Sequence, residues 1–360
     1  MNRLALLLVL PLTYACGVDV AQSSDTPSGD NVAVGDSPGD VGTVAASRQV
    51  SGIALSPVEA STLAASAAFD RLHRRCSARA PFVHTSVVAG VPGDTLGGVT
   101  LLGNELEMWA TLRTTDYDST YYQLVRMTRP STSAPFALAA EPQITSTHRY
   151  ETGLTVSRDG LSLYATVEVP SGVLHVPAGM EIRVAHRDNT SQRFGTLEPT
   201  GISGVKYPWQ FSQLATNAAG DGLLASASFA AAWRIKEIPF AAFALDTNPS
   251  TQTALDPNVM AQGAVATQDG HFAYVGVGSW SPGLLFSIGL AEKGAGATKY
   301  GAPEVLGAPA NPDASHGGVP QWLSSDECRL YYIAQAEGGG SRTLMVASKA
   351  SPFGPIAISP

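Results

Sequence analysis

The sequence predicts an all-β protein, and three observations lead to this prediction. Charged residues make up 14% of the chain, whereas it contains 36 glycines and 24 prolines, a composition that favours turns over long helices. A pattern of strand, tight turn and strand recurs five times. Between these copies lies a third strand, followed by an aromatic residue near proline or arginine. Together they indicate four antiparallel strands per repeat, which is the blade of a β-propeller.

The repeated hairpin is clearest in VSRDGLSLYAT (156–166). Its relatives are LLGNELEMWAT (101–111), NAAGDGLLASAS (217–228), ATQDGHFAYVG (266–276) and LSSDECRLYYIA (323–334). Asp, Asn and Gly suit such turns, because Asx side chains bond to nearby backbone and glycine accepts a left-handed conformation. The turn residues lie 48 to 62 residues apart, at Asn104, Asp159, Asp221, Asp269 and Asp326. This period is typical of a propeller, so we interpret the five residues as structural and not catalytic.

The number of repeats predicts five blades over residues 80–360. Residues 80–82 (Ala-Pro-Phe) match Ala-Pro-Phe at 134–136, so the segment 78–98 is expected to supply a strand that completes the last blade. A sixth blade drawn from residues 44–90 is the alternative.

Three segments precede the predicted propeller. Residues 1–15 form a signal peptide, with Arg3 before an apolar core too short to span a bilayer. Cys16 ends a stretch that resembles a bacterial lipobox, which implies a lipidated N-terminus. Residues 16–50 are poor in large apolar residues and are expected to be a disordered linker. Residues 51–79 contain an expected helix at 56–75, where Ser56 and Pro57 suit a helix start.

The other two cysteines, Cys76 and Cys328, are predicted to form a disulfide. Cys328 lies in the turn of the last blade, and Cys76 precedes the strand expected to complete that blade. A bond between them would fasten the ring and stabilise it by at most about 4–5 kcal/mol. The alternative for this pair is two free thiols. For Cys16 the alternative is that it is not modified and the protein is secreted without a lipid.

The motifs S-R-D-G-x-x-L-Y (157–164) and S-S-D-E-C-R-L-Y (324–331) resemble the repeats of TolB-like, WD-repeat-like β-propellers. The closest in style are those of lipoproteins from myxobacteria and related bacteria. The resemblance covers roughly residues 80–360. TolB-like propellers generally have six blades, whereas this sequence has five motifs. Because a shared fold does not carry function, the resemblance implies the propeller and the lipoprotein class alone.

Patterns for catalysis and cofactors are missing from the sequence. The seven histidines are scattered without metal-ligand spacing, and no G-x-S-x-G motif occurs. We therefore expect no enzyme activity, metal or cofactor. The net charge of −8, without a basic run, disfavours nucleic acid as a partner. Elsewhere in the sequence, too, no apolar run is long enough for a membrane helix.

The remaining prediction is a non-catalytic protein that binds an envelope protein, peptidoglycan or another polysaccharide at the bacterial outer membrane. Gly17 after the lipid cysteine is compatible with sorting to that membrane. Aromatic residues in loops are the candidate binding-face residues: Tyr117, Tyr122, Trp209, Trp280 and Trp322. Their alternative role is to fill gaps between blades. Two other functions stay open, a propeller glycoside hydrolase or lyase acting on surface polysaccharide, and a structural envelope lipoprotein without a specific ligand.

Overall fold

Twenty β-strands and no helix make up the part of the chain that the structure describes. The computed structural model describes residues 75–350, except for 94, 117–118, 140–149, 171–176, 201–204, 207–209, 230–231, 241–253, 257, 279–285, 312–315 and 337–341. All of them belong to one unit of the chain, Pro57–Pro360. The predicted all-β class is confirmed. The signal peptide, the linker and the predicted helix, apart from Arg75, lie outside the described residues.

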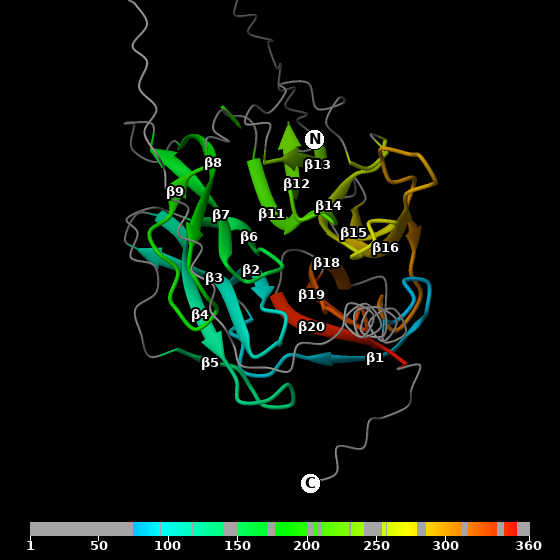
Figure 1. The fold of residues 1–360 in the computed structure, drawn as a ribbon, viewed down its shortest axis with the longest axis horizontal. Coiled ribbons are helices and arrows are strands. Elements are labelled where there is room, and N and C mark those ends of the chain that lie inside the picture. Colours follow the sequence, from blue (N-terminus) through cyan, green and yellow to red (C-terminus); the bar gives the residue numbers. More distant parts are fainter. Residues whose placement is uncertain are drawn as a thin grey trace, which may run out of the picture. The chain divides into compact units, whose positions relative to one another are not determined.

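The strands form five antiparallel blades, which Figure 1 shows arranged around a common centre. The first blade consists of β2 (Leu96–Leu101), β3 (Glu107–Asp116), β4 (Ser119–Thr128) and β5 (Ala137–Leu138). The second consists of β6 (Tyr150–Val156), β7 (Ser162–Pro170), β8 (Pro177–His186) and β9 (Glu198–Pro199), with β10 (Val205–Lys206) beside β8. One residue pair, Tyr122 with Tyr150, joins the facing edges of these two blades.

The other three blades continue the ring. The described part of the third blade is β11 (Gln210–Thr216), β12 (Gly222–Phe229) and β13 (Ala232–Pro239). The fourth is β14 (Ala261–Ala266), β15 (Phe272–Gly278), β16 (Phe286–Glu292) and β17 (Glu304–Val305). The fifth is β18 (His316–Leu323), β19 (Arg329–Ala336), β20 (Arg342–Lys349) and β1 (Phe82–Val87).

Strand β1 completes the fifth blade, as the sequence predicts. It pairs antiparallel with β20, from Phe82 opposite Lys349 to Val87 opposite Met345. The first described strand of the chain therefore lies beside the last one. This pairing and the five hairpins confirm a propeller of five blades rather than six.

The hydrophobic core is divided among the five interfaces between neighbouring blades. Separate clusters of buried side chains join the first blade to the second, the second to the third, the third to the fourth, the fourth to the fifth and the fifth to the first. The last of these clusters contains Leu96 and Met108 of the first blade together with Tyr331 and Ile333 of the fifth. Since fully burying one large apolar side chain stabilises by about 1.5–3 kcal/mol, these clusters are the main force that closes the ring.

The repeated turn is held by its Asx side chain. Asp159 Oδ1 accepts a hydrogen bond from the backbone N–H of Leu161 at 3.0 Å and one from Ser157 Oγ at 2.5 Å. These bonds lower the pKa of Asp159, the bond from Ser157 most strongly. Gly160 follows with a φ of +75°. Asn104, Asp269 and Asp326 accept the same backbone hydrogen bond in their turns, so these four residues have the predicted structural position.

The third turn corrects one predicted position. Ala219, and not Asp221, lies where Asp159 lies in the second turn, because Gly220 is the residue with positive φ. Asn217 organises this turn instead. Its Oδ1 accepts hydrogen bonds from the N–H groups of Gly220 and Gly222 at 2.9 and 3.1 Å, and its Nδ2 donates to Asp221 at 2.9 Å. The sequence offers two pairs that end in glycine, Ala219-Gly220 and Asp221-Gly222, and the prediction chose the second, which lies two residues too far along the chain.

A second repeated feature lies at the end of the third strand of each blade. In four blades a basic residue lies at this position and stacks over an aromatic ring. The Cζ atom of Arg129 lies 4.4 Å from the centroid of the Phe136 ring, and that of Arg187 lies 4.3 Å from the centroid of the Phe194 ring. The Nζ atom of Lys293 lies 4.7 Å from the centroid of the Tyr300 ring. Lys349 lies 5.3 Å from Phe82, which β1 supplies. We call these four cations the clasp residues. Phe240 occupies the equivalent position in the third blade and stacks on Tyr164.

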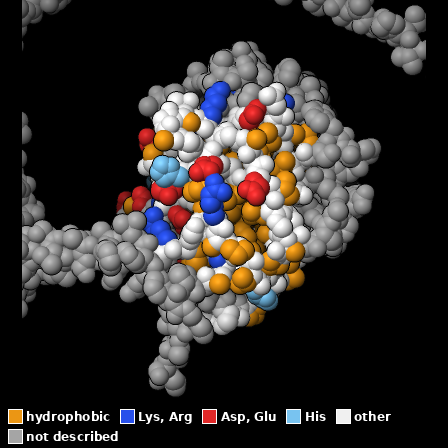
Figure 2. Space-filling view, turned by 90° about the vertical axis from the view of Figure 1, so that its right-hand side faces the viewer, with side chains coloured by type: hydrophobic (Ala, Val, Ile, Leu, Met, Phe, Trp, Pro, Cys, Tyr) orange, Lys and Arg blue, Asp and Glu red, His pale blue; other side chains and the backbone are white. Residues whose placement is uncertain are grey.

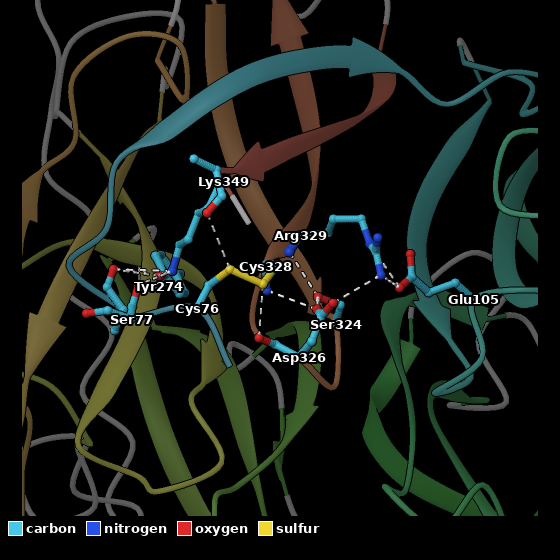
Figure 3. Close-up of a disulfide and its surroundings, with 11 residues drawn as sticks. Cys76, Ser77, Glu105, Tyr274, Ser324, Asp326, Cys328, Arg329 and Lys349 are labelled. Carbon is cyan, nitrogen blue, oxygen red and sulfur yellow. Dashed lines mark hydrogen bonds and ion pairs between the residues drawn. A yellow bond between two sulfur atoms is a disulfide. The ribbon is translucent and has the colours of Figure 1, made fainter. Parts of the chain in front are cut away.

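The predicted disulfide between Cys76 and Cys328 is present, with Cα atoms 5.0 Å apart. Figure 3 shows it between the clasp residue Lys349 on one side and Arg329 and Glu105 on the other. Lys349 Nζ donates to Tyr274 Oη at 2.6 Å and to the carbonyl of Ser77 at 2.8 Å. The segment leading into β1 is thus fastened covalently to the last hairpin and by hydrogen bonds to the fourth and fifth blades.

Lys349 is expected to make stability depend on alkaline pH. Burial lowers the pKa of its ammonium to about 8, against the attraction of Glu327 and Asp326. Between about pH 8 and 10 the unfolded chain therefore holds more protons than the folded one, so the free energy of unfolding rises with pH. We expect a rise of about 1–2 kcal/mol between pH 8 and 9.5 in urea unfolding. The Lys349→Met variant should lose this slope, and an equal slope in both proteins would contradict the assignment.

Candidate functional site

A cavity of 250 Å³ lies where the five inner strands of the ring end. All five blades contribute to it, and its walls are the last residues of β2, β6, β11, β14 and β18 and the first residues of the turns that follow. We call it the turn-face cavity. Its place on the axis of a propeller, at the end of the central strands, makes it the first candidate for a binding site.

The inner strands are shaped in a common way before they reach the cavity. Each of the five contains a register shift, and such bulges increase local twist. Buried hydroxyl groups bond the backbone N–H groups that the shifts expose. Thr111 Oγ1 accepts from Gly98 N at 2.8 Å, Thr166 Oγ1 from Gly153 N at 3.0 Å, and Ser226 Oγ from Gly263 N at 2.6 Å. At these three shifts the exposed backbone N–H groups are therefore satisfied by side chains of the protein itself.

The rim of the turn-face cavity is organised around Gln268 of the fourth blade. Its side chain donates to the carbonyl of Ser325 at 2.7 Å and accepts from Arg75, while its N–H donates to Glu327 Oε1 at 2.8 Å. These bonds hold the fourth and fifth turns together.

Arg158 crosses from the second turn to the third, where its Nη1 donates to the carbonyl of Ala218 at 2.8 Å. Burial lowers the pKa of this guanidinium, and Glu327 acts in the opposite direction. Arg158 lines the cavity, and its hydrogen bond to Ala218 holds the guanidinium in place there.

Among the described residues that line the cavity, Arg158 is the one charged side chain. The lining includes hydroxyl and amide side chains, among them Thr155, Gln321 and Ser324, and apolar ones such as Val265 and Trp322. The lining residues that the structure describes include no Asp or Glu. General acid–base cleavage of a glycosidic bond needs two carboxyl groups across the substrate, so these walls do not supply that pair.

The structure brings one of the five predicted aromatics to this site. Trp322 lines the turn-face cavity, and its ring packs edge-on against Tyr331 with centroids 5.6 Å apart. Tyr122 packs instead against the core between the first two blades, which is the gap-filling role. Tyr117, Trp209 and Trp280 lie outside the described residues.

The sequence did not reveal the remaining wall residues because they come from five different repeats. Thr155, Gln268 and Gln321 lie in separate blades, and no local motif connects them. Arg158 had a signal, since it occupies the second position of S-R-D-G, but that position was interpreted only as part of a turn.

Figure 2 shows one face of the described residues and its mixture of side-chain types. In the side view of Figure 2, acidic and basic side chains lie among hydrophobic ones, without a broad basic region over the described residues. Exposed hydrophobic residues include Val83 and Val87 of β1 and Val305 of β17. Among the described residues, no group of three or more His, Cys, Asp or Glu side chains is placed to hold a metal ion. A search of the same residues finds no helix long and apolar enough to cross a membrane.

Comparisons with known proteins give similarity in fold at low identity. No family model matches the chain, and no curated protein matches it. TolB from Acinetobacter baumannii is 10% identical with a TM-score of 0.38, over 71% of this chain and 55% of that chain. The putative TolB from Agrobacterium tumefaciens is 11% identical with a TM-score of 0.42, over 72% and 87%. An endo-arabinase from Bacteroides thetaiotaomicron is 12% identical with a TM-score of 0.45, over 75% and 99%. At these scores the likenesses carry no functional argument, and the propeller assignment rests on the strands themselves.

Proposed function

We propose that this chain is a non-catalytic binding protein of the bacterial envelope, and that its turn-face cavity receives part of a protein or glycan partner. The observation that carries the proposal is the described part of the cavity wall, which combines one guanidinium, several hydroxyl and amide groups and the Trp322 ring, without a carboxylate among these residues. Such a wall recognises polar groups by hydrogen bonds and lacks the acid–base pair for hydrolysis.

The size of the cavity limits what enters it. Its 250 Å³ is below the roughly 300–1,000 Å³ of pockets that enclose a drug-sized ligand. A single side chain or one sugar ring therefore fits, while the rest of the partner lies across the turns outside. Arg158 and Gln268 are fixed by hydrogen bonds to neighbouring turns, so little conformational entropy is lost when they bind.

We also propose that a lipid on Cys16 attaches the protein to the outer membrane. The lipobox-like sequence before Cys16 and the permissive Gly17 support this assignment, and the linker to residue 50 separates the propeller from the lipid surface. Acyl chains on one cysteine together give stable attachment where a single chain does not.

A capture experiment tests the binding function. The soluble Cys16→Ser protein is immobilised and exposed to envelope proteins and to purified peptidoglycan. Ser325→Trp in the same background places a large ring at an exposed wall residue of the cavity. Thr196→Trp, at an exposed residue away from the cavity, is the matched control.

We expect the parent and Thr196→Trp to capture the same partner, and Ser325→Trp to lose at least 10-fold in affinity. Reproducible capture of nothing by any of the three proteins would reject the binding function. Equal capture by Ser325→Trp would reject the turn-face cavity as its site. Release of reducing sugar ends from a captured glycan would show an enzyme instead.

A further inference from the structure

A second cavity, of 420 Å³, lies between the third and fourth blades. Its walls come from the third turn, from β12 and β13, from the fourth turn and from the loop between Lys293 and Tyr300. We call it the interblade groove. It contains more charged and titratable side chains than the turn-face cavity: Glu237, Asp269, His271, Lys293 and Tyr300.

An aromatic ring fills the corresponding place in the other four blades. Strand pairing identifies the position, because Leu224 lies opposite Glu237 as Trp109 lies opposite Arg126. The same position holds Tyr164, Tyr274 and Tyr331. The third blade has Leu224 there, and Leu224 lines the groove. The groove therefore occurs at the one blade whose inner hairpin lacks the ring.

The leucine also leaves a clasp residue without its usual partner. Arg129 donates to Tyr331 Oη at 3.2 Å, and Lys349 donates to Tyr274 Oη at 2.6 Å. Arg187 donates to Glu107, which also accepts from Trp109. Lys293 faces the third blade, where Leu224 offers no oxygen at the position of these rings. Among the described residues its ammonium has a contact with the Tyr300 ring and no hydrogen-bond acceptor.

The fourth turn also lacks a glutamate that two other turns carry. The first and fifth turns carry Glu105 and Glu327 at the positive-φ position, and each carboxylate reaches the preceding blade. The fourth turn has Gly270 at that position. A Cβ on Gly270 would lie 2.8 Å from Ala218 Cβ, so the close contact of the third and fourth turns excludes a side chain. Lys293 is left with three donors beside an open groove.

Each of the two carboxylates in the groove accepts hydrogen bonds from the described residues through only one of its oxygens. Glu237 Oε1 accepts from Asn217 Nδ2 at 3.1 Å, and Asp269 Oδ1 accepts from Thr267 Oγ1 and the His271 N–H. The second oxygen of each has no hydrogen bond from the described residues. Tyr300 is buried, and burial together with Glu237 and Asp269 raises its pKa to about 12, so the phenol keeps its proton at neutral pH.

We propose that the interblade groove binds a neutral saccharide, with Lys293 donating to its hydroxyl groups and Glu237 and Asp269 accepting from them. A hydroxyl group both donates and accepts, so adjacent hydroxyls satisfy carboxylates and an ammonium without adding charge. An anionic ligand would lie beside two carboxylates, and a cationic one beside Lys293. The volume also suits a ligand larger than one that the turn-face cavity admits. This site stands apart from the proposed function, although Gln268 lines both cavities.

The Leu224→Tyr variant tests the site sharply. It restores the residue type of the other blades, fills the groove and offers Lys293 a phenol oxygen. We expect saccharide binding to fall at least 10-fold while the melting temperature stays unchanged or rises. Leu224→Met, which keeps the side-chain volume, is the matched control and should bind like the parent. Lys293→Met removes the donor and should also lose at least 10-fold.

The measurement is saturation-transfer NMR on the Cys16→Ser protein with a panel of neutral mono- and disaccharides, one uronic acid and one free amino acid. Binding of a neutral saccharide that Leu224→Tyr and Lys293→Met weaken supports the proposal. No binding at 10 mM (about 2.7 kcal/mol of affinity) by any panel member, or binding only of the charged ligands, overturns it. Undiminished binding by Leu224→Tyr also overturns it. If that variant does not fold, Lys293→Met against Leu224→Met decides. The Ser325→Trp variant should keep this binding, which separates the groove from the turn-face cavity.

Discussion

Replacing Cys76 and Cys328 together with alanine is expected to lower the free energy of unfolding by about 3–5 kcal/mol. The bond closes a loop of 252 residues, and cross-linking distant residues removes many conformations from the unfolded chain. It also joins the segment before β1 to the last hairpin, where β1 has to pair with β20. Urea unfolding of the Cys16→Ser protein with and without the two replacements measures the difference.

Reduction provides the control for this result. The parent with its disulfide reduced, and each single replacement, should unfold at the same urea concentration as the double variant. The Cys76 N–H donates to the Asp326 carbonyl at 2.9 Å, a contact that the alanine variants retain. A double variant as stable as the oxidised parent would show that β1 holds its place without the bond.

Replacing Glu105 with glutamine is expected to cost about 3–5 kcal/mol. Its side chain is 4% exposed and accepts from Arg329 Nη2 at 2.6 Å and from Tyr331 Oη at 2.5 Å. It also lies 3.9 Å from Arg129, whose side chain is 5% exposed. Burial and Glu105 both raise the pKa of Tyr331, so the phenol remains a donor. A neutral amide leaves the buried Arg129 without its carboxylate, and breaking such pairs is costly.

Glu327→Gln is the matched control for Glu105→Gln. Glu327 is a buried glutamate at the same turn position, with a φ of +58° against +61° for Glu105. Its carboxylate, however, accepts one hydrogen bond from the described residues, from the backbone N–H of Gln268. We expect a cost of about 1 kcal/mol, typical of one hydrogen bond. Equal costs for the two variants in urea unfolding would contradict the assigned role of the Glu105 cluster.

The blade architecture could be predicted because its signals are local and repeated. In four of the five turns an Asx residue lies three positions before the next strand and accepts from the N–H two residues on, as Asp159, Asp269 and Asp326 do. Closure of the ring was predictable from the shared Ala-Pro-Phe, since Phe82 lies over Lys349 as Phe136 lies over Arg129. The disulfide followed from that closure.

The clasp residues were missed although the sequence carries a signal for them. Arg129, Arg187 and Lys293 each precede their aromatic partner by seven residues, which is too long a spacing for a hairpin motif. Neither cavity had a motif of its own, although Trp322 of the turn-face cavity was among the predicted aromatics. The turn-face cavity is assembled from five blades, and the interblade groove exists because Leu224 is smaller than its counterparts. Both depend on side chains that meet only after the ring has closed.

The pairing of β1 with β20 sets an order of events during synthesis. The ribosome makes Phe82–Val87 first, and its partner Arg342–Lys349 emerges only after the other four blades. Until β20 has been made, β1 has no strand to pair with. It also carries two valines, Val83 and Val87, that stay exposed in the finished fold. Contacts so distant in sequence form slowly. Completion of the circle is therefore expected to be the last step of folding, and the one at which an unfinished chain is most open to pairing with another copy.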